Sequence, residues 1–389
     1  MDANQYATTM FGRAKRTLGA HSYVAYFPER LPREFALSGE SIMRTADAEA
    51  ALGRLAGSGR LLASPQLLVY PYLRREAVSS ARIEGTQASL SDVFDAEASE
   101  RPLSPDVEEV VNYVRAMEQG IDLLPSLPLS VRLVCEMHSV ILAGVRGSER
   151  RPGEIRQTQN WIGTPDATVA TARFVPPPPD ELGALLTDLE LFIHASPQLP
   201  PLVQAALVHY QFETIHSFLD GNGRLGRLLI IFFLIQRGRL QTPLLYLSSY
   251  FEAHRQTYYD TLQGVRESGN FEAWLNFFLR GVEVQAGDAI ARSERLMDLR
   301  EHYRQAVRAD TRGAPNALVD LVFQRPFLNA RIVEDHLNIT RPSALRALRQ
   351  LQELNVLDPA PDGPRGQLRW RATEVLEILT DEPDPADPA

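Results

Sequence analysis

Residues 216–227 of this 389-residue chain read HSFLDGNGRLGR, and this stretch indicates the fold more strongly than any other. It combines a histidine, an aspartate, an asparagine, three glycines and two arginines. Such polar and charged groups are costly to bury unless they have partners. We therefore expect a tight turn between two core elements that binds a charged ligand.

The segments on both sides of this turn have the character of core helices. Pro200 and Pro201 open a segment with helical spacing of apolar residues, and proline suits the first turn of a helix. After the turn, residues 224–237 are strongly apolar and end at Gly238. The apolar run at 228–235 is far shorter than the roughly 20 residues that span a membrane. We predict a buried helix and no membrane span.

Two interpretations of the turn leave part of its sequence or its setting unexplained. A glycine corner with a histidine cap leaves Asn222 and the two arginines unexplained. Gly221, Gly223 and Gly226 match the dinucleotide-binding pattern G-x-G-x-x-G, but that pattern must follow a strand and needs an acidic residue about 20 positions later. The preceding segment is helical and the acid is missing, so we reject a dinucleotide site.

A metal cage is a third interpretation. His209, Glu213 and His216 share one helix face, and Glu213-x-x-His216 is half of a di-iron motif. The second Glu-x-x-His of such a site is absent from the sequence, as is HExxH. A dedicated transition-metal site is therefore disfavoured.

A phosphate site accounts for every polar residue of the turn. Residues 221–223 let several backbone N–H groups point at one anion, at the positive end of the following helix. Arg224 and Arg227 share a face of that helix, and guanidinium groups match phosphate oxygens. Asp220 is a hard oxygen ligand of the kind that Mg²⁺ prefers, and His216 is placed to accept a proton from a hydroxyl.

The pattern H-x-F-x-D-G-N-G-R-x-x-R resembles the signature of the Fic family. The matching positions are His216, Phe218, Asp220, Gly221, Asn222, Gly223, Arg224 and Arg227. Most proteins of this family transfer the AMP of ATP to a Ser, Thr or Tyr hydroxyl of a target protein. Ser217 replaces a common proline, and Gly223 stands where the phosphotransferase branch has lysine, which favours nucleotidyl transfer.

The resemblance implies a role for each residue of the signature. His216 would be the general base and Asp220 the Mg²⁺ ligand. The phosphate contacts would come from Gly221, Asn222, Gly223, Arg224 and Arg227. The implied enzyme is a nucleotidyltransferase that uses ATP and Mg²⁺.

A second short stretch, SSARIEG at residues 79–85, places a glutamate at the negative end of a predicted helix, where a carboxylate is disfavoured. Taken alone it reads as a solvated surface glutamate beside a glycine cap. It also resembles the inhibitory helix of the family, S/T-x-x-x-E-G/N, through Ser80, Glu84 and Gly85. The resemblance implies an ion pair between Glu84 and Arg227 that keeps Arg227 from the γ-phosphate of ATP. The same glutamate could instead support the removal of AMP from a target.

The expected fold is mainly α, a Fic-type helical core with a β-hairpin flap, an N-terminal helical region and a C-terminal winged helix-turn-helix. We expect the 54–62 stretch to be turn-like, and the hairpin at 157–175 to dock the target protein. The predicted boundaries are 1–104 (N-terminal region with an inhibitory helix at 66–85), 105–285 (Fic catalytic domain), 286–312 (connecting helix), 313–378 (winged-helix module) and 379–389 (disordered tail).

The C-terminal arginines leave a second class of function open. Arg341, Arg346, Arg349, Arg365, Arg369 and Arg371 could meet the phosphates of DNA, which would make the chain a transcription regulator with a nucleotide-sensing domain. The net charge of −9 argues against non-specific coating of nucleic acid. Cys135 is the single cysteine and the N-terminus lacks an apolar leader, so we expect a cytoplasmic protein. A homodimer is also open.

Overall fold

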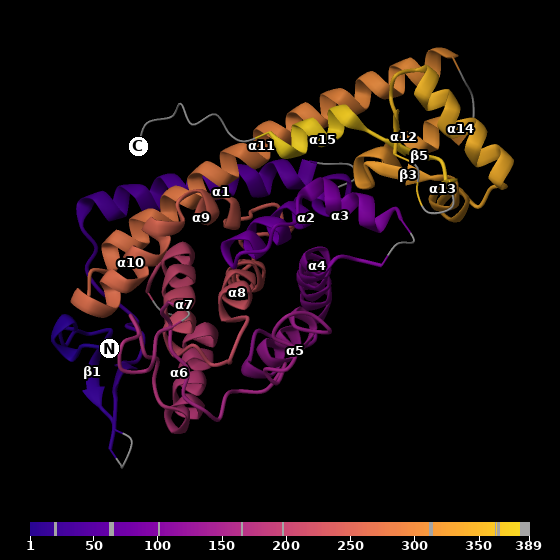
Figure 1. The fold of residues 1–389 in the computed structure, drawn as a ribbon. Coiled ribbons are helices and arrows are strands. Elements are labelled where there is room, and N and C mark those ends of the chain that lie inside the picture. The colour runs from indigo at the N-terminus through magenta and orange to yellow at the C-terminus, as the bar shows by residue number, and fades with distance from the viewer. Residues whose placement is uncertain are drawn as a thin grey trace.

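The computed structural model describes residues 1–18, 22–61, 66–99, 102–164, 166–196, 198–310, 314–361, 363 and 366–381. Within them the fold is mainly helical, as predicted, with two small antiparallel sheets (Figure 1). The tail at 382–389 and Arg365, both named in the predictions, lie outside the described residues.

A group of five helices surrounds the turn at residues 216–221 and forms the lower half of Figure 1. The polypeptide enters the turn from one helix whose residues are almost all buried and leaves it into another. Because both are buried on all faces, they are central helices of the fold. The five helices are α4 (Pro105–Leu123), α5 (Val131–Ile141), α6 (Leu182–His194), α7 (Pro201–Ile215) and α8 (Asn222–Gln236).

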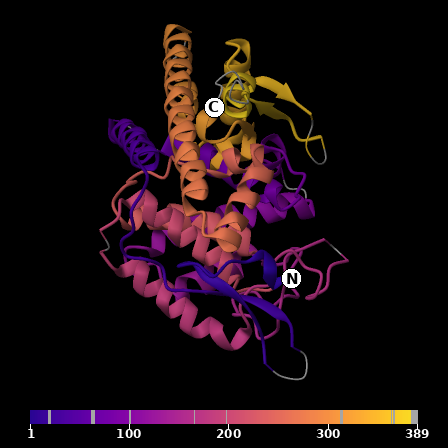
Figure 2. The same cartoon turned by 90° about the vertical axis from the view of Figure 1, so that its left-hand side faces the viewer.

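The N-terminal region contains a two-stranded sheet that the sequence analysis missed. Strand β1 (Gly12–Arg16) pairs antiparallel with β2 (Val24–Pro28), with Gly12 opposite Pro28. A short 3₁₀ helix, η1 (Ala3–Gln5), precedes it. Figure 2 shows this hairpin at the end of the molecule opposite the C-terminal elements.

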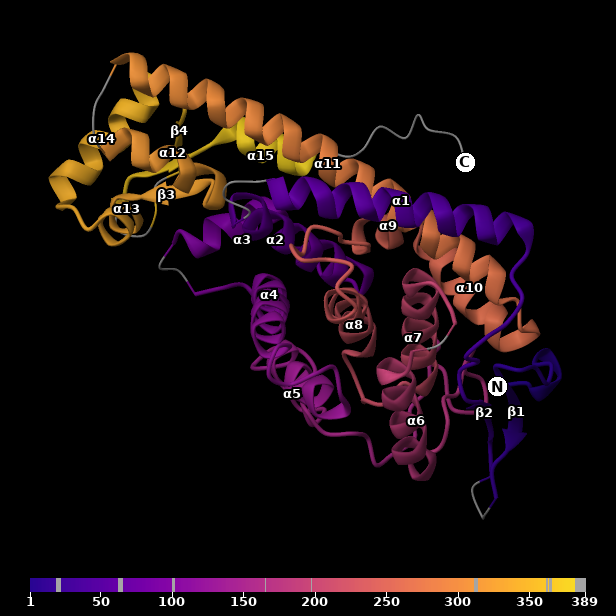
Figure 3. The same cartoon turned by 180° about the vertical axis from the view of Figure 1, so that it is seen from behind.

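The prediction of a turn-like stretch at residues 54–62 is wrong. Helix α1 (Gly39–Leu61) runs through these residues and lies along α11 (Phe271–Asp310) (Figure 3). Gly53 and Gly57 have open space beside them, and Gly59 contacts Thr242 and Leu244. Glycine lowers helix propensity by only about 1 kcal/mol per residue, so packing against α11 outweighs it.

The helix that carries Glu84 forms as predicted. Helix α2 (Gln66–Ile83) ends one residue before Glu84, and Gly85 adopts a φ of 99° that favours glycine. Helix α3 (Leu90–Glu97) then begins with the predicted cap, in which Ser89 Oγ accepts a hydrogen bond from the backbone N–H of Asp92.

The segment at 157–175 is not a regular hairpin. A single isolated antiparallel bridge joins Ile162 and Phe174, and no named strand lies in this segment among its described residues. A 3₁₀ helix, η2 (Pro179–Glu181), follows it. Arg156 holds the two ends of the segment together, because its guanidinium donates to the carbonyl oxygens of Thr158 at 3.2 Å and Pro177 at 2.6 Å.

The rest of the chain is a long helical spine and a small C-terminal unit. Two shorter helices that meet at His254, α9 (Ser248–Ala253) and α10 (Arg255–Ser268), lead into this spine. Helix α11 then continues without a break across the predicted boundary at 285. No helix in the described part of the chain combines the length and the apolar character that crossing a membrane requires.

The C-terminal unit consists of short helices and a three-stranded antiparallel sheet with the strand order β3-β5-β4. Its assignment as a winged-helix module stays a prediction. Arg369, predicted to face DNA, is instead buried and forms an ion pair with Asp95 of α3. The elements are α12 (Ala314–Gln324), β3 (Phe327–Asn329), α13 (Ala330–Leu337), α14 (Arg341–Glu353), β4 (Asp358–Ala360), β5 (Arg369–Arg371) and α15 (Thr373–Thr380).

Candidate functional site

The turn between α7 and α8 is shaped by two residues with left-handed backbone conformations. His216 ends α7 with φ 50° and ψ 58°, and its N–H donates to the carbonyl of Phe212 at 3.0 Å. Gly221 precedes α8 with φ 75°. A non-glycine residue in this region is uncommon and is held there by its surroundings. The chain therefore reverses within six residues and presents the N-terminus of α8.

The side chain of Asn222 fastens the turn internally. Its Oδ1 accepts from the N–H of Phe218 at 2.9 Å, and its Nδ2 donates to the carbonyl of Phe218 at 2.8 Å. Asn160 from the 157–175 segment donates to the same carbonyl at 2.8 Å. Asn222 was predicted to contact phosphate. With its side chain engaged in this way, that contact would come from its backbone N–H at the start of α8.

His138 of α5 supports the turn by contacting two of its residues, Asp220 and Phe218. The sequence did not single out this histidine. The N–H of Gly153 donates to Nδ1 at 2.8 Å, so Nε2 carries the proton and donates to the carbonyl of Asp220 at 2.9 Å. The ring stacks on Phe218 with 3.8 Å between centroids. Burial lowers the pKa of His138 to about 4, which keeps the ring neutral.

His216 is half-buried and has the protonation state of a base. Desolvation, together with the positive charges of Arg156 and Arg266, lowers the pKa of its imidazole to about 3. Its Nδ1 is buried without a hydrogen-bond partner in the described part of the chain. Arg156, also missed from the sequence, donates to the carbonyl of His216 at 2.9 Å and so fixes the backbone there. A neutral imidazole at neutral pH can accept a proton.

Asp220 is the best candidate for a metal ligand. Its side chain is 41% exposed, it accepts from the N–H of Gly221 at 2.6 Å, and its Oδ1 lies 3.7 Å from Arg224. No group of three or more His, Cys, Asp or Glu suited to a metal occurs among the described residues. A lone carboxylate fits Mg²⁺, which commonly takes one or two carboxylates plus substrate phosphates and water. It does not fit a metal held by protein ligands alone.

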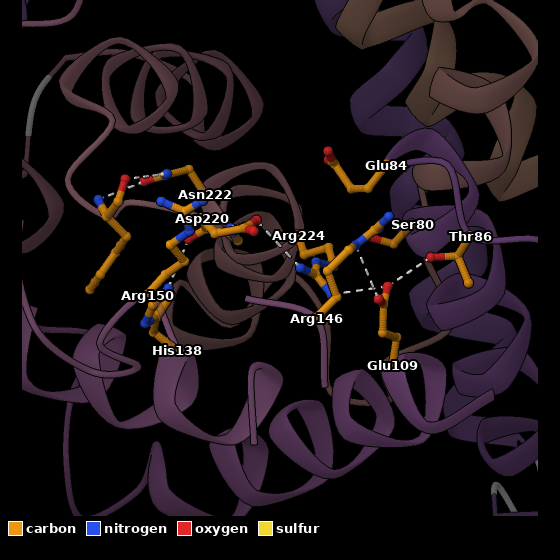
Figure 4. Close-up of polar contacts among 12 residues, drawn as sticks. Ser80, Glu84, Thr86, Glu109, His138, Arg146, Arg150, Asp220, Asn222 and Arg224 are labelled. Carbon is orange, nitrogen blue, oxygen red and sulfur yellow. Dashed lines mark hydrogen bonds and ion pairs between the residues drawn. The ribbon is translucent and has the colours of Figure 1, made fainter. Parts of the chain in front are cut away.

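The two arginines of the turn are both buried but have different partners. Arg224 pairs with Asp220 and, at 3.5 Å, with Glu109 of α4 (Figure 4). Arg227 pairs with Glu84, since its Nη2 lies 2.8 Å from Glu84 Oε1. The ion pair that the family resemblance implied is thus present in the structure.

Ser80 and Gly223 complete the contact between α2 and α8. Arg227 donates from Nε to Ser80 Oγ at 2.9 Å and from Nη2 to the Ser80 carbonyl at 2.8 Å. A Cβ atom on Gly223 would lie 2.3 Å from Glu84 Oε1, so a larger residue would push this carboxylate out of its present position. Desolvation raises the pKa of Glu84, but the charge and hydrogen bond of Arg227 outweigh it, and the pKa is lowered. Glu84 is therefore ionised at neutral pH.

The alternative metal cage does not form. His209 donates from Nδ1 to the carbonyl of Gly226 at 2.9 Å, and its Nε2 lies 2.8 Å from the hydroxyl of Tyr258. Burial lowers its pKa to about 3. Both ring nitrogens of His209 are thus occupied by hydrogen bonds within the core, and the residue packs between helices.

Models of known protein families match two adjacent stretches of the chain. Residues 42–122 match the Fic/DOC family N-terminal model, and residues 128–234 match the Fic/DOC family model. The second stretch contains the whole turn and both flanking helices.

The chain therefore contains a Fic/DOC family domain, preceded by a Fic/DOC family N-terminal domain.

Curated relatives match part of this chain, and a solved structure shares its fold. A Protein adenylyltransferase Fic from Drosophila grimshawi is 35% identical over 133 residues, which is 33% of this chain and 25% of the relative. One from Culex quinquefasciatus is 31% identical over 151 residues, 38% of this chain and 27% of the relative. This Fic/DOC chain therefore spans about a quarter of the length of these relatives. A Fic family protein from Desulfovibrio desulfuricans G20 shares the fold, with a TM-score of 0.58, 19% identity and coverage of 87% of this chain and 97% of that one.

Proposed function

We propose that this Fic/DOC protein is an autoinhibited adenylyltransferase that moves AMP from ATP to a Ser, Thr or Tyr hydroxyl of a target protein. One arrangement carries the proposal: a neutral histidine, a partly exposed carboxylate and two buried arginines converge on the N-terminus of α8, and one of the arginines is occupied by Glu84. The relatives named Protein adenylyltransferase Fic support the transferred group.

The site would hold the triphosphate by its backbone and its arginines. The N–H groups of residues 221–223 and the positive end of α8 would face the phosphates. Arg224 and Arg227 would contact phosphate oxygens with their guanidinium groups. Asp220 would hold Mg²⁺, which when bound would neutralise charge on the phosphates.

The chemistry is an in-line displacement at the α-phosphorus. The target hydroxyl oxygen forms a bond to that phosphorus while its proton passes to the imidazole of His216. The bond from the α-phosphorus to the bridging oxygen of the β-phosphate breaks, and pyrophosphate leaves with that electron pair. Proton transfer of this kind contributes about 10² to 10⁴ in rate. The arginines stabilise the charge that develops on the phosphates.

Inhibition follows from the position of Arg227. Its guanidinium already has Glu84 and Ser80 as partners, so the γ-phosphate of ATP must displace the carboxylate to use it. While Glu84 stays, the triphosphate cannot take the arrangement that aligns the α-phosphorus with the hydroxyl. Glu84 would therefore act as the off switch.

The target would dock on the 157–175 segment beside the turn. Trp161 and Ile162 of this segment are 43% and 37% exposed, although both are apolar. The segment is tied to the turn because the N–H of Arg156 donates to the carbonyl of Ser217 at 3.0 Å. A peptide seated on these side chains would place its hydroxyl near His216.

Incubation with Mg²⁺ and ATP labelled at the α-phosphate tests this function. We expect label on protein from Glu84→Gly, much less from the wild type, and almost none from the Glu84→Gly/His216→Ala double variant. Glu34→Gly and His194→Ala, both at exposed positions, serve as matched controls. Absence of label from Glu84→Gly in the presence of a cell extract would overturn the proposal. Loss of AMP from a pre-labelled target that depends on Glu84 would support the alternative, a hydrolase.

Duplex DNA binding is a second candidate function. Arg341, Arg346 and Arg349 are exposed on one face of α14, and together they line a hollow of about 650 Å³. Guanidinium groups spaced along one helix face suit a phosphate backbone. Fluorescence anisotropy with a labelled duplex over a salt series would test it. Arg346→Ala should reduce the slope of log affinity against log salt by about 1 if that residue contacts a phosphate.

A further inference from the structure

Glu109 is a buried carboxylate at the site that does not belong to the signature of the turn. It lies on α4 and is only 2% exposed. Its Oε2 accepts from the hydroxyl of Thr86 at 2.8 Å and lies 3.5 Å from Arg224 Nη1, while its Oε1 lies 3.4 Å from Arg146 Nε (Figure 4). Burying a carboxylate is costly unless such partners compensate it. Its presence here therefore needs a reason beyond packing.

The hydrogen bond that Glu109 accepts from Thr86 holds the segment that follows α2. Thr86 stands two residues after Glu84 and is itself buried. The next residue, Gln87, donates from its N–H to Asp106 of α4 at 2.9 Å. Helix α4 thus fastens this short segment at two adjacent points. The hydrogen bond from Thr86 ends on a buried charge, which makes it the stronger kind.

The same oxygen of Glu109, Oε2, also lies beside Arg224. That guanidinium is 2% exposed, and its other ion pair, with Asp220, is long at 3.7 Å. Asp220 is also the candidate Mg²⁺ ligand, so in the ATP-bound state it would be shared with the metal. Glu109 is then the partner that can keep Arg224 pointed at the phosphates.

We propose that Glu109 is a positioning residue for this site. Its carboxylate holds Arg224 toward the phosphates and, through Thr86, keeps the Glu84 segment against Arg227. This inference rests on the proposed adenylyltransferase function. Two different substitutions separate these roles. Removal of the Thr86 hydroxyl releases the inhibitory segment, while removal of the charge of Glu109 misplaces Arg224.

Thr86→Val tests the first role, because it keeps the side-chain volume and removes the hydroxyl. AMP transfer by the otherwise wild-type chain should rise by about tenfold or more, the effect expected when a buried hydrogen bond to a charged group is lost. In the Glu84→Gly background the same substitution should change the rate by less than about twofold, since no inhibitory carboxylate remains to release. Thr8→Val, at an exposed position, is the control.

Glu109→Gln tests the second role, because glutamine can still accept from Thr86 but carries no negative charge to form an ion pair with Arg224. In the Glu84→Gly background we expect the KM for ATP, and the ATP dissociation constant measured by calorimetry, to rise by about tenfold with a smaller change in kcat. Glu118→Gln on the same helix is the control. A merely structural role would lower the unfolding temperature and the active fraction and leave KM unchanged.

The possible failures are distinguishable. If Glu84→Gly itself gains no transfer activity, the proposed function fails, and the calorimetric comparison still tests the positioning of Arg224. If Glu84→Gly is active, the inference is overturned when Thr86→Val has no effect in the wild-type background or the same effect in both. An unchanged KM and ATP affinity in Glu109→Gln would overturn it as well.

Discussion

Replacing Glu84 with glutamine should raise the affinity for ATP more than the affinity for AMP. The substitution keeps the shape of the side chain and removes its charge. The pair it weakens joins Arg227, 1% exposed, to a carboxylate that is 32% exposed, across 2.8 Å. If the γ-phosphate competes with this carboxylate for Arg227, the competitor becomes weaker in the variant. AMP has no γ-phosphate, so its affinity should change little.

The expected gain in ATP affinity follows from the strength of the contact between Arg227 and Glu84. A hydrogen bond to a charged group contributes about 1.5–3 kcal/mol, and partial exposure of Glu84 reduces this through solvent screening to about 1–2 kcal/mol. That corresponds to a factor of about 5 to 30 in the dissociation constant. Ser80 still holds Arg227 through two hydrogen bonds, so the guanidinium stays in place.

Isothermal titration calorimetry with Mg²⁺-ATP and with AMP measures the difference directly. We expect Glu84→Gln to bind ATP about 5 to 30 times more tightly than the wild type and AMP within about twofold. Glu34→Gln provides the control for a change in net charge. Equal gains for both nucleotides, or no gain for ATP, would refute the competition between Glu84 and the γ-phosphate.

Three further predictions concern pH, the support of the turn, and the metal. The Glu84→Gly variant should show no loss of kcat near pH 6.5 and should decline only toward the lowered pKa of His216, about 3, measured as a pH–rate profile. His138→Phe in that background keeps the stacking on Phe218 but loses the bond to Asp220, and kcat should fall about tenfold with a normal circular dichroism spectrum. Asp220→Asn should raise the Mg²⁺ concentration for half-maximal transfer about tenfold in a metal titration.

The pH dependence of the inhibitory pair has a definite sign. The pKa of Glu84 is lower in the folded protein than its ordinary value, so the pair contributes stability above that ordinary value and loses it as the pH falls through the folded value. Inhibition should therefore persist across neutral and mildly acidic pH. Wild-type transfer activity that rose steeply between pH 7 and pH 6 would contradict this assignment.

Local signals in the sequence were enough to predict much of the helical fold. Pro201 at the start of α7, the capping serine before α3 and Gly85 after α2 each act within a few residues. The missed elements depend on tertiary contacts. Strand β2 has buried residues whose backbone pairs with Val175, and α1 carries its glycines because it packs along α11.

The residues of the site likewise fall into those that local sequence reveals and those that tertiary contacts bring in. The signature from His216 to Arg227 is contiguous, so the sequence shows its residues together. Glu109, His138 and Arg156 reach the turn from other helices and loops, and one buried polar residue within a helix produces no periodic pattern. Glu84 was found only because the resemblance supplied its partner. Asn222 shows that residue type alone does not tell whether a side chain faces the ligand or its own backbone.

A crystal structure of Glu84→Gly with Mg²⁺ and a non-hydrolysable ATP analogue tests the central claim most directly. The account predicts the triphosphate at the N-terminus of α8, with Arg227 on the γ-phosphate, the metal on Asp220 and His216 near the α-phosphate. A nucleotide bound elsewhere, with the 216–227 turn making no phosphate contact, would contradict it.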